Sequence, residues 1–459
     1  MFSEEVFQWY HPNNLNLKFI HIIKEKPDWL LLAGVLLLLS QFSGCSSTLN
    51  TSSASASAGE TSSVNSVVLV PNQNPVPASF KSVQLYANNA QNNPPVLELN
   101  SDDHLTLSFD ELTDINGQFR ITFTHHSKTW APSNIPQDWY LNGIGELILG
   151  GGQVSQSRGP DYIHYEMRIP LNEIQFTSSG NYLLHVTDPE SGQELFSLPF
   201  FITENEGELS STSQTLFNSG NRFMPVHRLF STYDVPDLVK YPEFDLSFSY
   251  VQNRFWSDSR FTDSYDFNTP GTAKFDLTQS NAFPANVGYV IKNLNSFSQN
   301  NTHIVEWDPG SNPPKVTLRE DVVNFLNSDF GTSSSFRAYS PASSKRADYA
   351  RVIFRLDGSD SLTPDNNIYI LGDFNQWSAT SESVMAFDST TGLWKNSQLL
   401  KEGIYSYQYI LLDETGHIDL TSLSDNNSPN VQEYMSYVYF NDPERKFDRL
   451  LAVETFYAR

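Results

Sequence analysis

Apolar and polar side chains alternate over short stretches along most of this chain. The segment Leu105–Phe109 (LTLSF) separates its apolar residues by hydroxyl residues, and Phe244–Val251 (FDLSFSYV) repeats the same spacing. A period of two places the apolar side chains on one face of an extended strand, whereas an amphipathic helix needs a period near 3.6. The pattern therefore predicts an all-β protein built from half-buried strands.

The alternating stretches fall into blocks that are separated by turn residues. The first block predicts strands at Ser82–Tyr86, His104–Phe109, Phe119–Thr124, His164–Ile169 and Tyr182–Thr187, and the last block predicts strands at Tyr349–Leu356, Ile368–Gly372, Gly392–Trp394 and Tyr405–Leu411. Gly180-Asn181 predicts a turn, and Thr391-Gly392 and Glu402-Gly403 predict hairpin turns. Short, regularly spaced strands of this kind are typical of β-sandwiches.

The blocks predict a domain organisation. We expect an N-terminal β-sandwich at 80–205, a less regular β-rich middle domain at 206–345 and a C-terminal immunoglobulin-like sandwich at 346–459. A chain of 459 residues is too long for one hydrophobic core, which agrees with about three domains. The predicted fold class is therefore tandem immunoglobulin-like β-sandwich domains with a less regular β-rich middle region.

The single cysteine of the chain, Cys45, directly follows an apolar stretch that ends in LLLLSQFSG. The apolar run from Trp29 to Leu39 has the length of the hydrophobic part of a signal peptide and is too short to span a bilayer. Gly44 is the small residue that precedes the lipidated cysteine in bacterial lipoproteins. We therefore predict a lipoprotein signal peptide at 1–45 with lipidation at Cys45. A buried free cysteine in a core helix is the alternative.

The segment that follows, 46–79, is rich in Ser, Thr, Ala and Asn and has prolines near its end. This composition predicts a flexible tether between a membrane anchor and a folded body. Ser46 stands where an aspartate would retain a lipoprotein at the inner membrane, so the predicted location is the periplasmic face of the outer membrane.

Composition and charge narrow the classes of function. The formal net charge is −24, which repels nucleic acid and anionic headgroups, so we expect membrane attachment through lipid rather than through charge. The chain lacks Gly-x-Ser-x-Gly, His-Glu-x-x-His and Gly-Lys-Ser/Thr sequences. His125-His126 lies at a strand end, where neighbouring side chains point to opposite faces and cannot readily share a metal. We therefore expect no enzymatic activity, no metal and no cofactor.

Two aromatic clusters remain as candidate binding residues. In the first, an alternating strand runs through Gln252-Asn253 into Arg254 and Trp256. Arginine and tryptophan are enriched at interface hot spots, so Arg254 and Trp256 are candidates for partner binding, with an ordinary core position as the alternative for Trp256.

The second cluster comprises GDFNQW, which ends at Trp377, then GLW, which ends at Trp394, and then GIYSYQY. It resembles the glycogen-binding immunoglobulin-like modules, in which tryptophans stack on sugar rings. The resemblance implies that Trp377 and Trp394 could bind an α-glucan. Gln408 stands in place of the lysine that contacts sugar in those modules, so a scaffold without sugar binding is the preferred interpretation.

The chain as a whole resembles the plug protein of the type IX secretion system of Bacteroidota. The segments that carry the resemblance, in chain order, are LTLSFDEL, TH with WAPS, SGNY, QNR, ADY and LKEGIYSYQY. Ser127 stands where family members commonly have cysteine. The resemblance implies a non-enzymatic periplasmic protein that binds and occludes the outer-membrane β-barrel translocon. An α-glucan-binding lipoprotein that uses Trp377 and Trp394 is the alternative function.

Overall fold

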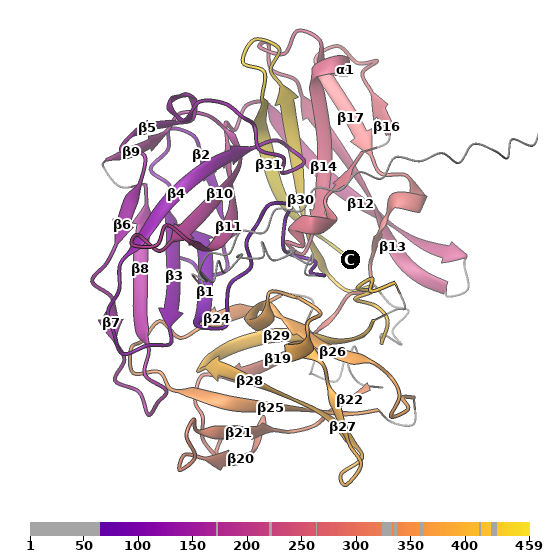
Figure 1. Ribbon diagram of the computed structural model, residues 1–459. Helices are drawn as coiled ribbons and strands as arrows, with labels where there is room; N and C mark the ends of the chain where they lie inside the picture. Colours follow the sequence, from indigo (N-terminus) through magenta and orange to yellow (C-terminus); the bar gives the residue numbers. More distant parts are fainter. Residues whose placement is uncertain are drawn as a thin grey trace, which may run out of the picture. The chain divides into compact units, whose positions relative to one another are not determined.

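The computed structural model describes residues 65–170, 173–219, 223–262, 264–323, 333–334, 337–358, 361–412, 415–423 and 429–459. The predicted signal peptide, the lipidation at Cys45 and the tether as far as residue 64 lie outside these residues. Strands dominate the described part of the chain and pack as successive pairs of sheets (Figure 1). The predicted all-β fold of tandem sandwiches is confirmed.

The first sandwich is contiguous in sequence. One of its sheets has the strand order β1 (Phe80–Ala87), β3 (Leu105–Glu111), β8 (Ile163–Ile169) and β7 (Gln153–Val154). The facing sheet has the order β2 (Val96–Glu98), β11 (Glu194–Thr203), β10 (Gly180–Thr187), β4 (Phe119–His126) and β6 (Leu147–Leu149). The apolar faces of both sheets share one core, where Phe80, Phe109 and Phe119 pack edge to face at centroid distances of 5.2–5.8 Å.

A second pair of sheets follows. One sheet has the order β12 (Glu208–Ser219), β13 (Phe223–Asp234), β17 (Thr272–Asp276) and β16 (Ser264–Asp266), with β18 (Phe283–Pro284) beside β13. The other has the order β15 (Arg260–Phe261), β14 (Leu246–Gln252), β30 (Gln432–Asn441) and β31 (Asp448–Ala458). Phe248 and Phe275 stack between the sheets with their ring centroids 3.8 Å apart.

A third pair of sheets follows, and β5 (Leu141–Gly143) and β9 (Ile174–Phe176) form a separate two-stranded sheet. The first contains β23 (Ser333–Ser334), β19 (Tyr289–Leu294), β29 (Gly403–Leu411) and β24 (Tyr339–Pro341), with β26 (Ile368–Gly372) beside β29. The second contains β20 (Ile304–Asp308), β21 (Lys315–Leu318), β25 (Tyr349–Asp357), β28 (Leu393–Lys401) and β27 (Ala386–Asp388), with β22 (Asp321–Val322) beside β25.

Strand pairing crosses the boundary that the sequence placed between residues 345 and 346. β14 pairs with β30, β19 pairs with β29, and β21 pairs in parallel with β25. The last two strands of the chain thus complete a sheet that begins in the middle region (Figure 1). The sheets therefore combine strands from both sides of the boundary between residues 345 and 346. Strands that pair in one sheet can come from distant segments of the chain.

Two expected turns differ from the structure. β27 and β28 pair across Thr391-Gly392 as predicted, but Glu402-Gly403 joins β28 to β29, which belong to different sheets. A Cβ on Gly403 would lie 2.6 Å from the Ser340 carbonyl oxygen, so glycine there permits a close backbone approach. Gly180-Asn181 is not a turn either, because both residues are buried at the start of β10.

Residues 65–79 differ from the flexible tether that their composition predicted. Val70 is buried among Trp130, Phe201 and Trp256, and Ser66 forms a β-bridge with Ser378. Composition alone could not reveal these contacts, because short polar and β-branched residues also suit an extended segment that lies along a groove.

Candidate functional site

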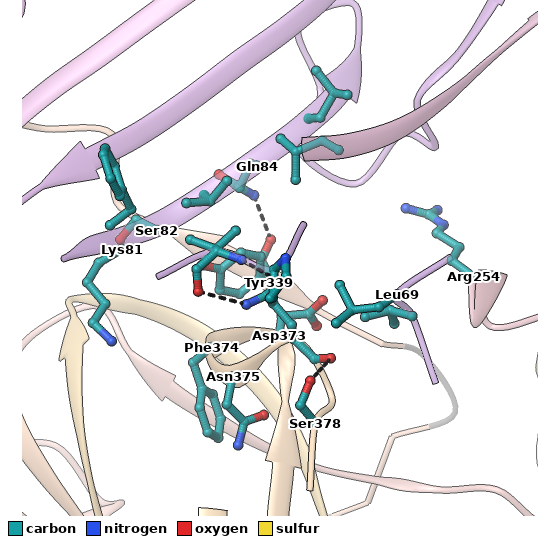
Figure 2. A pocket seen from close by; sticks show the side chains of 18 of the residues that line it. Leu69, Lys81, Ser82, Gln84, Arg254, Tyr339, Asp373, Phe374, Asn375 and Ser378 are labelled. Atoms are coloured by element: carbon teal, nitrogen blue, oxygen red, sulfur yellow. Dashed lines mark hydrogen bonds between the residues drawn. The ribbon is translucent and has the colours of Figure 1, made fainter. Parts of the chain in front are cut away.

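A cavity of about 490 Å³ lies where the three pairs of sheets meet. Its walls come from the segment 68–78, the start of β1, the residues that follow β14 and the 3-10 turn η5 (Asp373–Asn375). Figure 2 shows Lys81 and Gln84 on one side of this junction cavity and Asp373 and Asn375 on another. We treat the junction cavity as the candidate site because both predicted partner-binding residues, Arg254 and Trp256, line it.

Arg254 reaches the junction cavity from a left-handed turn at the end of β14. Asn253 and Arg254 have φ values of 50° and 59°, a conformation in which the chain reverses sharply. The Arg254 guanidinium donates two hydrogen bonds to the Glu433 carboxylate, Nε to Oε1 at 2.7 Å and Nη2 to Oε2 at 2.9 Å. Its side chain remains 23% exposed, so Arg254 could still meet a partner while paired.

Trp256 is more buried than we expect for a residue that binds a partner. It is 8% exposed and packs in a cluster with Val70, Trp130 and Phe201, at a centroid distance of 5.2 Å from Phe201. This environment agrees with the core position that the sequence left open for Trp256. Partner binding by Arg254 and Trp256 stays a prediction.

Arg337 holds the left-handed turn in place, and sequence reasoning missed it. Its guanidinium pairs with the Asp373 carboxylate, and its Nη1 donates to the carbonyl oxygens of Asn253 and Arg254 at 3.0 and 3.2 Å. Burial alone would lower the pKa of Arg337, but Asp373 raises it above its ordinary value. An isolated arginine 83 residues from its carbonyl partner leaves no pattern that sequence reasoning could detect.

The two tryptophans of the glycogen-binding resemblance are buried. Trp377 is 0% exposed and packs edge to face on Phe255 and Tyr289, and Trp394 is 3% exposed and lies against Phe387. Sugar stacking requires an open ring face, which neither residue presents. In this chain, the shared motif therefore forms a turn with buried tryptophans and does not form an open surface.

The turn at the motif depends on Asn375. The Asn375 Oδ1 accepts a hydrogen bond from the Gly372 amide at 2.9 Å, and its Nδ2 donates to the Ile370 carbonyl at 2.8 Å. Gln408, which stands in place of the sugar-contacting lysine, is 6% exposed and donates to the Gly288 carbonyl. The two Asn375 hydrogen bonds satisfy backbone groups at the turn, and the Gln408 hydrogen bond satisfies the buried Gly288 carbonyl.

A buried charge cluster joins the first sandwich to the third pair of sheets. Asp110 on β3 accepts hydrogen bonds from His164 Nδ1 at 2.7 Å, Lys401 Nζ at 2.8 Å and Tyr349 Oη at 2.6 Å. The side chains of Asp110 and Lys401 are 0% exposed, and the Lys401 ammonium lies 4.4 Å from the Tyr162 ring centroid. Sequence reasoning missed this cluster as well.

Asp110 and Lys401 each favour the charged form of the other. Burial alone would raise the pKa of Asp110, but the hydrogen bond from His164 and the charge of Lys401 hold it below its ordinary value. Burial lowers the pKa of Lys401, and Asp110 opposes that shift. Because the Asp110 and Lys401 side chains have no contact with solvent, the pair can fix the docking of two sheets but cannot reach a substrate.

The described residues offer little else for chemistry. No group of three or more His, Cys, Asp or Glu side chains in them is placed to hold a metal ion. His125 and His126 are each hydrogen-bonded to a backbone carbonyl, of Ser179 and Trp130. No helix in the described ranges is long and apolar enough to cross a bilayer.

The fold and the buried contacts between its sheets define a class of protein. It is a β-sandwich protein whose sheets are held together by buried polar side chains. Within that class, residues 80–204 match the family model of the type 9 secretion system plug protein 1st domain, which confirms the resemblance predicted from the sequence. The match covers the first sandwich, including Asp110 and His164.

One solved structure supports the fold beyond the first sandwich. The crystal structure of a hypothetical protein from Parabacteroides merdae is similar, with a TM-score of 0.72 at 20% identity over 84% of this chain and 99% of that chain. Dimeric latent PorU from Porphyromonas gingivalis aligns with 83% of this chain and 34% of its own at 10% identity, but its TM-score of 0.14 carries no argument. No curated protein matches the chain.

Proposed function

We propose that this protein is a non-enzymatic periplasmic plug that binds and occludes the outer-membrane β-barrel translocon of the type IX secretion system. The match of residues 80–204 to the plug protein first domain carries the proposal. A channel wide enough for folded cargo would leak periplasmic contents when idle, so a folded body must close it. Buried contacts between the sheets, such as Asp110 with Lys401, suit a body that must resist deformation at a pore.

The predicted lipid anchor at Cys45 fits the same role. A body tethered to the membrane of its partner has a high effective concentration there, so a moderate affinity suffices for binding and still permits release. The partners in this proposal are the translocon barrel and, through lipid, the outer membrane. No observation favours the α-glucan alternative, because Trp377 and Trp394 are buried.

Co-purification tests the proposal. The affinity-tagged wild-type chain, extracted from its native membranes with a mild detergent, should bring down a large β-barrel protein. Deletion of the gene should make the outer membrane permeable to large solutes that the intact barrel excludes. Recovery of the wild-type protein without any large barrel, in repeated mild extractions, would count decisively against a plug.

A pair of arginine variants tests the predicted contact surface. Arg254→Ala removes a side chain that is 23% exposed and paired with Glu433, and Arg355→Ala removes one that is 22% exposed and paired with Glu320. If Arg254 touches the barrel, only Arg254→Ala should reduce the amount of co-purified barrel. Equal recovery with both variants would remove Arg254 from the interface.

A further inference from the structure

Residues 65–76, which we call the strap, lie in a groove that all three pairs of sheets help to form. At one end Ser66 bridges Ser378 in antiparallel fashion, with the Ala379 amide donating to the Asn65 carbonyl at 2.9 Å. In the middle, Val70 is 4% exposed among Trp130 and Trp256. The strap therefore contacts the first sandwich as well as the motif around Trp377.

The remaining polar contacts of the strap engage mainly its backbone. The Gln376 side-chain amide accepts from the Val76 amide at 2.9 Å and donates to the Val76 carbonyl at 3.2 Å. Ser197 pairs with Asn74 in the same way, its Oγ accepting from the Asn74 amide at 2.8 Å and its own amide donating to the Asn74 carbonyl at 3.0 Å. Contacts of this kind recognise any extended chain. Selectivity comes from the aliphatic anchor Val70 and from three side-chain donors of the strap: Ser66 to the Gln376 carbonyl at 2.7 Å, Asn72 to the Trp130 carbonyl at 2.9 Å and Gln73 to the Ser197 carbonyl at 2.9 Å.

The strap buries few of its own side chains. Val70 is its only fully buried residue, and Pro71, Asn72 and Pro75 are exposed. Ordering an extended segment opposes binding through lost conformational entropy, and the strap has few buried side chains to offset that loss. The strap also forms one wall of the junction cavity, through Val68, Leu69, Gln73, Pro75 and Val76. Its removal would open the cavity toward Lys81 and Arg254.

We propose that the groove is a binding site for an extended, uncharged polypeptide segment of another protein, and that the strap is its in-chain occupant. An incoming segment would place an aliphatic side chain where Val70 lies and would use Gln376 and Ser197 to pair with its backbone. Binding would displace the strap and open the junction cavity. This inference does not depend on the plug role, because it rests on the contacts of the groove alone.

A reversible disulfide that holds the strap in place tests whether the strap moves. Ser66 and Ser378 form a non-hydrogen-bonded antiparallel pair, since the bonds flank them from Val67 to Trp377 and from Ala379 to Asn65. Such pairs have Cα atoms about 4.5 Å apart, within the range of a disulfide. The full chain with Ser66→Cys and Ser378→Cys should therefore form a disulfide, with Cys45→Ser in the background to remove the competing thiol.

The probe is a fluorescein-labelled peptide with the sequence of residues 65–77, measured by fluorescence anisotropy. The reduced double-cysteine protein should bind the peptide, and the oxidised protein should bind it at least ten-fold more weakly. Val70→Ala in the protein weakens the in-chain competitor, so it should bind the peptide at least three-fold more tightly than the Cys45→Ser parent. A peptide carrying Val70→Asp is the matched control and should not bind.

Three results would overturn the proposal. Equal peptide affinity of the oxidised and reduced proteins would mean that the peptide binds elsewhere. No peptide binding to the Val70→Ala protein, up to the solubility limit of the peptide, would mean that the groove accepts only its own strap. Failure of the two cysteines to form a disulfide under oxidising conditions would contradict the pairing of Ser66 with Ser378.

Discussion

Replacing Lys401 with methionine removes the positive partner of Asp110 from the buried charge cluster. The side chain of methionine fills a similar volume, so the change isolates the charge. Asp110 keeps the hydrogen bonds from His164 and Tyr349, but its carboxylate stays at 0% exposure without a full countercharge. Removing one partner of a buried ion pair lowers the free energy of unfolding by about 3–5 kcal/mol. Because two hydrogen-bond donors to Asp110 remain, we expect a loss near the lower limit.

Urea unfolding at neutral pH, followed by tryptophan fluorescence, measures this loss. With an m-value of about 3 kcal/mol/M or more, a loss of about 3 kcal/mol lowers the urea midpoint by roughly 1 M or less. The partly exposed pair of Lys395 with Asp388 provides the matched control, and Lys395→Met should change the midpoint far less.

A double variant separates the charge from the packing. Asp110→Asn with Lys401→Met removes both charges and should recover more than half of the stability that Lys401→Met loses. The reasoning is refuted if Lys401→Met unfolds at the wild-type midpoint, or if the double variant is as unstable as the sum of its single changes. Either result would mean that the buried pair contributes nothing specific to the docking of the sheets.

Three further predictions concern histidines, a glycine and the buried tryptophans. Burial lowers the pKa of His125 and of His227 to about 4. Between pH 6.5 and about 4, each histidine therefore binds a proton in the unfolded chain but not in the folded chain. As the pH falls through that window, each histidine should lower the free energy of unfolding by up to about 1.4 kcal/mol per pH unit. In single glutamine variants, the melting temperature should therefore decline less steeply on acidification. Gly180 has φ +143°, and a Cβ there would overlap the His125 Nε2, so Gly180→Ala should lower stability by about 1–3 kcal/mol in urea titrations. A Cβ on Gly192 meets no atom within 4 Å, so Gly192→Ala should have the smaller effect. Titration with malto-oligosaccharides should leave tryptophan fluorescence unchanged, because Trp377 and Trp394 are buried; saturable quenching would restore the sugar-binding alternative.

Local pattern predicted the strands well because strand periodicity is a local property. Leu105–Phe109 alternates in sequence and forms part of β3, and Tyr349–Leu356 forms most of β25. The hairpin expected at Glu402-Gly403 shows the limit of the same reasoning. Two apolar runs around a glycine look the same whether the strands pair in one sheet or cross between sheets, and only the partners of each strand decide.

The sequence by itself determined the all-β class, most strands of the first sandwich and the resemblance to the plug family, since each rests on short patterns of residues. Only the tertiary structure decided which side chains meet. Lys401 reaches Asp110 across 291 residues, Trp377 is covered rather than open, and residues 65–76 occupy a groove instead of moving freely. The physical reason is that alternation marks which face of a strand is apolar, while long-range contacts determine which part of the chain covers that face.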